Sequence, residues 1–270
     1  MFYYAVFQKN LKQQLMYRSE FLLTILGALL FIYVQISIWQ ALLGAEVVGA
    51  TNVIGGGGVI GLGHMVTFVI VSYLLRQASR TGFTDAFAKK INEGNISVDL
   101  IRPVGLKNVM FSEQASQNLC IIAFACVPVA VISHFVWGTS FDLHMLELLL
   151  FIASVLLAIV LCFYIEYIAG LLIFWTRDPV YTRQISGGLM LIFSGATIPL
   201  WFYPGWLAAI ARFLPFRLVA FEPIQIFLGQ VDVAGGLWIV LQQVLWIFAI
   251  YGLERFVWYK IQQNVFVQGG

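Results

Sequence analysis

Side chains that could carry out chemistry are few in this sequence, and Glu166 is the most conspicuous of them. It is an acidic residue deep within the apolar run 145–175. A carboxylate inside a membrane costs on the order of a few kcal/mol unless it is paired or protonated, which makes Glu166 a candidate functional residue. Three interpretations stay open: it faces a translocation path, it bonds to a polar group on another helix, or its helix emerges into water early.

The other residue types with catalytic or metal-binding chemistry form no usable pattern. His64, His134 and His144 are far apart in the sequence and lack the i, i+4 spacing of a helical metal site. No Ser-His-Asp, H-E-x-x-H or C-x-x-C arrangement is present. We therefore predict no metal site and no catalytic residues, so that the chain is not itself an enzyme.

The sequence also contains no nucleotide-binding motif in a suitable structural context. Gly56, Gly58 and Gly61 formally match G-x-G-x-x-G, but they open an apolar segment, whereas a dinucleotide site follows a strand and opens a soluble helix. The phosphate-loop pattern G-x-x-x-x-G-K-[ST] does not occur in the sequence. The chain is thus predicted to hold no cofactor and to hydrolyse no ATP by that route.

The composition indicates where these residues must be positioned. Of 270 residues, 61% are hydrophobic and only 10% are charged, against roughly 25% charged residues in average soluble domains. So few charges cannot cover the surface of a soluble protein of this length. The composition excludes a soluble enzyme, a disordered tail and a nucleic-acid binder, and it predicts a lipid bilayer as the solvent.

Apolar stretches near the roughly 20 residues needed to cross a bilayer mark six transmembrane helices. The predicted spans are 21–43, 54–75, 119–137, 145–175, 185–201 and 237–258. Between the last two, residues 202–236 are apolar but interrupted by Pro204, Pro215 and Pro223, which prevent one continuous span. We predict a re-entrant helical hairpin there, with Trp201, Tyr203 and Trp206 at the membrane interface.

Basic residues supply the orientation. With six spans, 13 of the 15 basic residues fall on one side, in the N-terminal tail, the second and fourth loops and the C-terminal end. By the positive-inside rule both termini are cytoplasmic. The fold class is thus an all-α polytopic membrane protein, with residues 21–270 forming one six-span transmembrane domain.

Two cytoplasmic segments have amphipathic patterns. In residues 1–20, Phe7, Leu11 and Leu15 recur every four residues opposite Lys9 and Lys12, which predicts a helix along the membrane surface. In the cytoplasmic loop 76–117, the apolar residues Phe83, Phe87 and Ile91 share a helical face. That second helix could lie in the headgroups or dock a soluble partner.

Ahead of the last span the sequence carries Gly195, Pro199, Pro204, Pro215 and Gly229, and the stretch 94–103 begins Gly-Asn-Ile and ends Leu-Ile-Arg-Pro. The first run is similar to the G…P…P…P…G pattern of the permease subunits of type-2 ATP-binding-cassette (ABC) exporters. The second resembles a motif of one branch of that family. The N-terminal helix, the six spans and the large cytoplasmic loop extend the resemblance over essentially the whole chain.

The resemblance implies a mechanism and a set of partners. Two permeases, this chain with a second copy or a sister permease, would form the pathway, and two separate cytoplasmic ABC ATPase subunits would bind ATP and Mg. A coupling helix at about 84–94 would dock on the ATPase, with Phe87 as its apolar contact, and the N-terminal helix would add a second contact. The implied coupling residues are Phe83, Phe87, Lys89, Lys90, Ile91, Glu93, Gly94, Arg102 and Pro103. The implied re-entrant gate residues are Gly195, Pro199, Trp201, Tyr203, Pro204 and Pro215. The implied location is a bacterial inner or plasma membrane.

Two other classes remain as alternatives. An ion-coupled secondary transporter would show several intramembrane charges and inverted repeats, whereas this sequence offers one clear intramembrane acid and no self-similar halves. A membrane-embedded enzyme or assembly factor is the third possibility. An apolar pathway with one carboxylate is compatible with a hydrophobic or cationic cargo.

Overall fold

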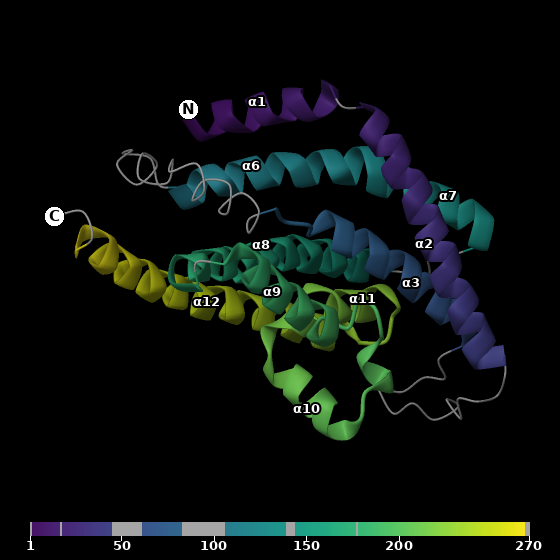
Figure 1. Cartoon of the computed structure of the whole chain (residues 1–270). Coiled ribbons are helices and arrows are strands. Elements are labelled where there is room, and N and C mark those ends of the chain that lie inside the picture. The colour runs from purple at the N-terminus through teal and green to yellow at the C-terminus, as the bar shows by residue number, and fades with distance from the viewer. Residues whose placement is uncertain are drawn as a thin grey trace.

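The computed structural model describes residues 2–16, 18–44, 61–82, 106–138, 144–176 and 178–267, and within these ranges it contains helices and no strand (Figure 1). The longer helices are α1 (Phe2–Met16), α2 (Arg18–Gly44), α3 (Leu62–Ala78), α6 (Leu106–Ile121), α7 (Val127–Trp137), α8 (Met145–Thr176), α9 (Pro179–Phe193) and α12 (Val233–Val267). Shorter pieces are η2 (Ile122–Cys126), η3 (Leu200–Phe202), α10 (Gly205–Phe213), η4 (Pro215–Val219) and α11 (Phe221–Phe227).

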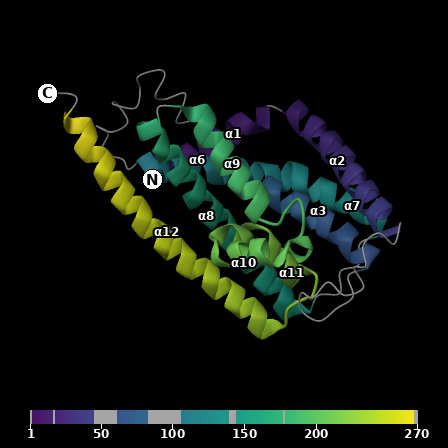
Figure 2. The same ribbon diagram turned by 60° about the horizontal axis from the view of Figure 1, so that its bottom comes forward.

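Helix α8 is central to the arrangement. It runs beside α12 over much of its length and also contacts α9 and α11 (Figures 1 and 2). Leu161 and Cys162 of α8 share a buried apolar cluster with Ile239 and Ile250 of α12. Residues of α8 near this cluster are therefore held in place by neighbours on several sides.

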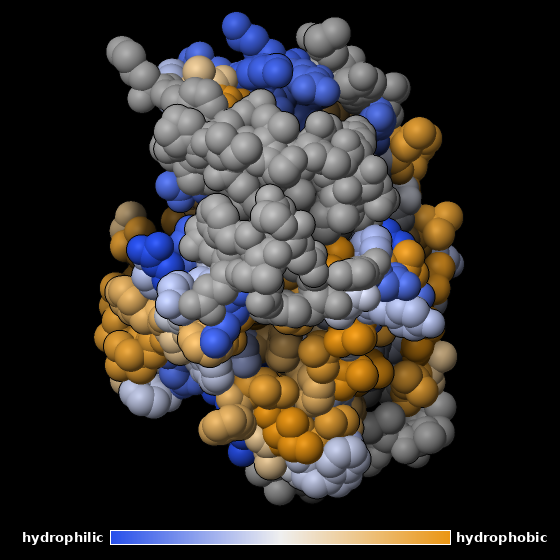
Figure 3. All heavy atoms as spheres, turned by 60° about the vertical axis from the view of Figure 1, so that its left-hand side comes forward, coloured by the Kyte–Doolittle hydropathy of each residue, from blue (hydrophilic) through white to orange (hydrophobic). Residues whose placement is uncertain are grey.

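The N-terminal half forms a second layer. Ile32 and Ile36 of α2 pack against Met65 and Val69 of α3 in one buried cluster, and α1 lies along α6 (Figure 1). Within the predicted N-terminal helix, 1–20, the structure describes α1 over residues 2–16 and the beginning of α2 from residue 18. The top of the molecule, where α1 lies, is hydrophilic, and apolar side chains dominate the lower half in Figure 3.

Helices α6 and α7 form one rod that is interrupted by the π-helical turn η2. Pro128 lies at the start of α7, where it lacks a donor and its ring crowds the carbonyl four residues earlier, so a widened turn relieves the clash. The rod begins well before the predicted span 119–137. Residues 106–117, predicted as the end of the cytoplasmic loop, belong to α6.

Four helices are long and apolar enough to cross a membrane, by length and composition: Glu20–Leu42, Lys107–Trp137, Met145–Ile173 and Val233–Ile261. They coincide with four of the six predicted spans. The described part of the second predicted span is the shorter apolar helix α3. The outer faces carry exposed large apolar side chains, among them Leu23 and Leu26 on α2 and Leu245 and Phe248 on α12, as expected of surfaces that face lipid.

The fifth predicted span, 185–201, differs from the structure. Helix α9 begins at Pro179, where the Asp178 side chain accepts hydrogen bonds from the Val180 and Tyr181 amides at 2.8 and 3.2 Å, and it ends at Phe193. The chain then turns at Gly195, whose φ is +70°. Apolarity alone could not locate this end, because the residues after the turn are as apolar as those before it.

Candidate functional site

The described helices line an open pocket of about 320 Å³ that carries charged side chains, and we refer to it as the cavity. The C-terminal end of α3, the middle of α8, the length of α9 and the chain after the Gly195 turn form its walls. Its polar lining residues are Arg76, Ser79, Arg80, Thr81, Glu166, Arg183, Ser186, Ser194 and Thr197. The sequence placed only one of these, Glu166, in a candidate pathway.

Glu166 lies about 15 Å before the C-terminal end of α8, at 1.5 Å per residue. It is half-buried, and its carboxyl group is within hydrogen-bonding reach of the Ser186 side chain on α9. The same residue also lines the cavity. Glu166 thus lies near a polar group of another helix and lines this pocket, and its place in a translocation path stays a prediction.

Three arginines line the same cavity as Glu166. Arg76 and Arg80 lie four residues apart at the end of α3, and Arg183 lies in the second turn of α9. The Arg76 guanidinium lies 4.6 Å from the centre of the Phe31 ring and 5.5 Å from that of Tyr73, a cation–π arrangement that orients it. The cavity is consequently more cationic than one carboxylate suggested.

Hydrogen bonds hold the end of α3 in position. Gln114 of α6 is buried; its Nε2 donates to the Arg80 carbonyl at 2.6 Å, and its Oε1 accepts from the Gly82 amide at 3.3 Å. On the other side, the Cys162 thiol donates to the Ser79 carbonyl at 3.3 Å. Helices α6 and α8 thus fix the turn that presents Arg80 to the cavity.

The interrupted segment after α9 is packed around aromatic rings. Trp201 contacts Phe68 and Phe221, with ring centroids 5.5 and 5.3 Å apart. Tyr203 donates from its hydroxyl to the Ile192 carbonyl, and Trp206 is exposed. Of the three aromatic residues predicted at the interface, Trp206 has the exposure expected there, whereas Trp201 and Tyr203 are half-buried.

The glycine and prolines predicted in this segment mark its turns. Gly195 and Pro199 are buried on either side of the bend that follows α9, Pro204 caps α10, and Pro215 begins η4. A Cβ atom at Gly195 would come within 2.9 Å of the Phe221 Cβ. Together these residues fold the segment back on itself.

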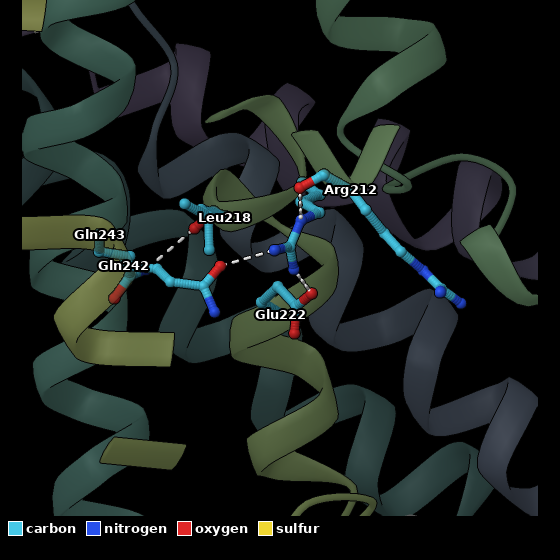
Figure 4. Close-up of polar contacts among 6 residues, drawn as sticks. Arg212, Leu218, Glu222, Gln242 and Gln243 are labelled. Atoms are coloured by element: carbon cyan, nitrogen blue, oxygen red, sulfur yellow. Dashed lines mark hydrogen bonds and ion pairs between the residues drawn. The ribbon is translucent and has the colours of Figure 1, made fainter. Parts of the chain in front are cut away.

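Arg217 connects this segment to the last long helix (Figure 4). It donates to the Arg212 carbonyl at 3.0 Å, to the Gln242 Oε1 on α12 at 2.6 Å, and to the Glu222 carboxylate as an ion pair. Burial, with a smaller contribution from the charge of Arg212, lowers the pKa of Arg217 from the usual arginine value. The guanidinium nevertheless stays protonated at neutral pH.

A second ion pair lies at the other end of the molecule. Glu254 of α12 is almost fully buried and accepts from the Lys107 Nζ of α6 at 3.0 Å. The Lys107 Nζ also lies 4.5 Å from the centre of the Tyr251 ring. Glu254 falls inside the predicted span 237–258 and was overlooked beside Glu166, although both are acids in apolar runs.

The remaining site predictions divide by location. The proposed coupling residues (Phe83, Phe87, Lys89, Lys90, Ile91, Glu93, Gly94, Arg102 and Pro103) lie outside the residues that the structure describes. Within the described ranges, no group of three or more His, Cys, Asp or Glu side chains could hold a metal ion. Cys120, Cys126 and Cys162 are buried and free.

Long apolar helices beside a pocket with charged side chains, with a folded-back segment before the last helix, define a polytopic helical membrane protein. The family model described as ABC-2 family transporter protein matches residues 22–264. The chain therefore belongs to this family, which confirms the resemblance to an ABC permease. The search of curated proteins gave no match.

Proposed function

We propose that this chain is the transmembrane permease subunit of an ABC exporter, which moves a substrate outward with ATP hydrolysed by a separate nucleotide-binding subunit. The observation that carries the proposal is the charged cavity between α3, α8 and α9 in a chain of a transporter family. Ionisable side chains that line a pocket among apolar helices mark a candidate substrate or ion path. The lack of a phosphate-loop motif fits an ATPase supplied by another chain.

The proposed orientation places the cavity on the cytoplasmic side. Arg80 lies at the end of α3 that leads into the loop predicted to be cytoplasmic, and Arg183 lies near the start of α9, beside the short connection from α8. A substrate would enter here from the cytoplasm. It would leave past the folded-back segment at the outer end, with both termini cytoplasmic, in a bacterial inner or plasma membrane.

Coupling to the ATPase is assigned to the segment between α3 and α6, with Phe87 as the apolar contact. Support comes from its two flanks, which are tied to the helices. Gln114 holds residues 80 and 82, and the Lys107–Glu254 ion pair holds the start of α6 against α12. A force on the segment would reach the cavity wall through Arg80 and the last helix through Glu254.

The pathway is proposed to form between two permeases, this chain and a second copy or a sister chain. Helix α9 supports this arrangement, since it lines the cavity through Arg183 and Ser186 and also exposes Tyr181 and Ile185. These exposed side chains lie on the same helix as the cavity residues and offer an apolar surface for a second permease.

The test uses inverted membrane vesicles that contain the chain together with the ABC ATPase encoded beside it in the genome. We expect the ATPase to copurify with the tagged permease, and uptake into the vesicles to require ATP. Replacement of Phe87 by Asp should abolish ATP-driven uptake, whereas Lys260→Gln, far from the coupling segment in sequence, should not. Uptake that needs only a proton gradient would contradict the proposal and indicate an ion-coupled secondary transporter.

A further inference from the structure

The cavity combines cationic and apolar walls. Its charged lining consists of Arg76, Arg80 and Arg183 against the single carboxylate of Glu166, and its apolar lining includes Met190 and Leu191 on α9. A guanidinium forms paired hydrogen bonds with carboxylate, phosphate or sulfate oxygens, and it is the side chain most suited to a planar anionic group. The sign of the lining thus favours an anion over a cation.

A buried hydroxyl adds a second, independent indication. Ser79 is 5% exposed, and its Oγ lies in the cavity wall without a hydrogen-bond partner. A buried hydroxyl without a partner is unfavourable, so such atoms in native structures usually have a ligand or water. Ser79 is the C-cap of α3 and lies between Arg76 and Arg80 in the sequence, so its O–H is beside the place proposed for the anionic group.

The volume of the cavity and its apolar lining residues indicate the chemistry of the part of the ligand that the arginines do not bind. A volume of about 320 Å³ is at the small end of the range for sites that hold drug-sized molecules. The apolar residues Leu75, Met190, Leu191 and Val219 line the space that the arginines leave. A compact charged group with an attached hydrocarbon portion matches both parts, whereas a fully polar ion would leave the apolar wall uncovered.

From these observations we propose that the cavity binds an anionic amphiphile as cargo, with its negative group at Arg76, Ser79, Arg80 and Arg183 and its apolar portion toward Met190 and Leu191. The proposal rests on the transport function proposed above and names its substrate class. It replaces the cationic preference that Glu166 alone would suggest. Glu166 would repel the anionic group and confine it to the arginine side.

The test is binding of a matched probe series to the purified chain in nanodiscs of neutral phosphatidylcholine. The probes share one fluorescent acyl chain and carry a phosphate, phosphocholine or trimethylammonium head, and inorganic phosphate is a competitor without a chain. We expect the phosphate-headed probe to bind about tenfold tighter than the trimethylammonium probe, since a hydrogen bond to a charged group contributes roughly 1.5–3 kcal/mol. Inorganic phosphate should compete only weakly.

The variants should move affinity in opposite directions. Arg80→Gln and Arg183→Gln should each weaken binding of the phosphate-headed probe by about three- to tenfold, and Glu166→Gln should strengthen it. Lys260→Gln, which removes a positive charge outside the cavity, should leave it unchanged. A general folding defect would not raise affinity, so the Glu166 variant separates a charge effect from damage.

Equal or tighter binding of the cationic probe, or an Arg80 variant that behaves like the Lys260 control, would overturn the proposal. Because binding is measured on the permease alone, it does not depend on the ATPase. A complex that hydrolyses ATP but ignores the phosphate-headed probe would refute only the cargo. If the chain binds this probe in nanodiscs but no ATPase copurifies with it from the vesicles, only the transport function would be refuted.

Discussion

Single residues in this protein matter most at two kinds of position. One is where the backbone conformation suits only glycine, and the other is where a charged group is partly removed from water. Gly195 allows the turn after α9 because it adopts a positive φ against Phe221 and Leu200. Glu166 shows the second case, since its carboxyl faces both Ser186 and the cavity. At both positions the surrounding residues, and not the helix propensity of the residue itself, determine which side chain fits.

Replacement of Gly195 by Ala should destabilise the protein by about 2–4 kcal/mol, because a Cβ at φ +70° is strained and would meet the Phe221 Cβ at 2.9 Å. Gly229→Ala is the matched control, since Gly229 also has a positive φ of 62° but has open space around its Cβ position. It should cost only about 1 kcal/mol. Thermal unfolding midpoints of the purified variants measure the difference, and equal losses would show that the Phe221 contact is unimportant.

At the same scale, Glu222→Gln should destabilise the protein by roughly 1–3 kcal/mol, because Arg217 would remain as a poorly compensated, largely buried cation. The double variant Arg217→Met with Glu222→Leu removes both charges and should recover part of the loss. The comparison uses unfolding midpoints followed by tryptophan fluorescence. The single variants Arg217→Met and Glu222→Leu complete the cycle, and a double variant that loses the sum of their two effects would mean that the pair contributes no coupling.

Elements in this fold are joined by polar contacts, some of them at helix ends, and by apolar packing along their lengths. Gln114 ties α6 to the end of α3, and Gln243 of α12 donates to the carbonyls of Ser154 on α8 and Leu218 on η4 at 3.0 and 2.9 Å. Such bonds are directional, whereas apolar faces can slide. The ends of helices are therefore where movement of one element would be passed to the next.

Replacement of Gln114 by Leu should reduce substrate-stimulated ATP hydrolysis several-fold while the ATPase still copurifies. The change removes both bonds to residues 80 and 82, each of which contributes about 0.5–1.5 kcal/mol. Gln117→Leu, three residues further along α6 and half-buried, is the control and should keep normal stimulation. Unchanged stimulation in the Gln114 variant would show that this tether plays no part in coupling.

At the scale of the whole molecule, the sequence predicted the helical membrane class and four of the long helices, because hydropathy over about 20 residues is a strong signal. It misplaced the end of α9, where a bend at Gly195 lies inside continuous apolar sequence. It treated Arg76, Arg80 and Arg183 only as markers of orientation, although the i, i+4 spacing of the first two could have indicated a shared face. Glu254 escaped notice because its partner, Lys107, is distant in sequence and only folding brings them together.

The orientation of the whole chain can be tested by cysteine labelling. The native cysteines, Cys120, Cys126 and Cys162, are buried and should give little background with a membrane-impermeant maleimide. His144→Cys lies at an exposed position before α8, and Lys260→Cys lies at an exposed position near the end of α12. If both termini are cytoplasmic, intact cells should label only the cysteine at position 144, and permeabilised cells should label both. The distribution of 13 of the 15 basic residues supports this orientation. Labelling of position 260 in intact cells would instead show that the C-terminal end lies outside the cell and that the orientation is the reverse. It would place the arginine cavity on the outer side, and the proposed loading of cargo from the cytoplasm would then fail.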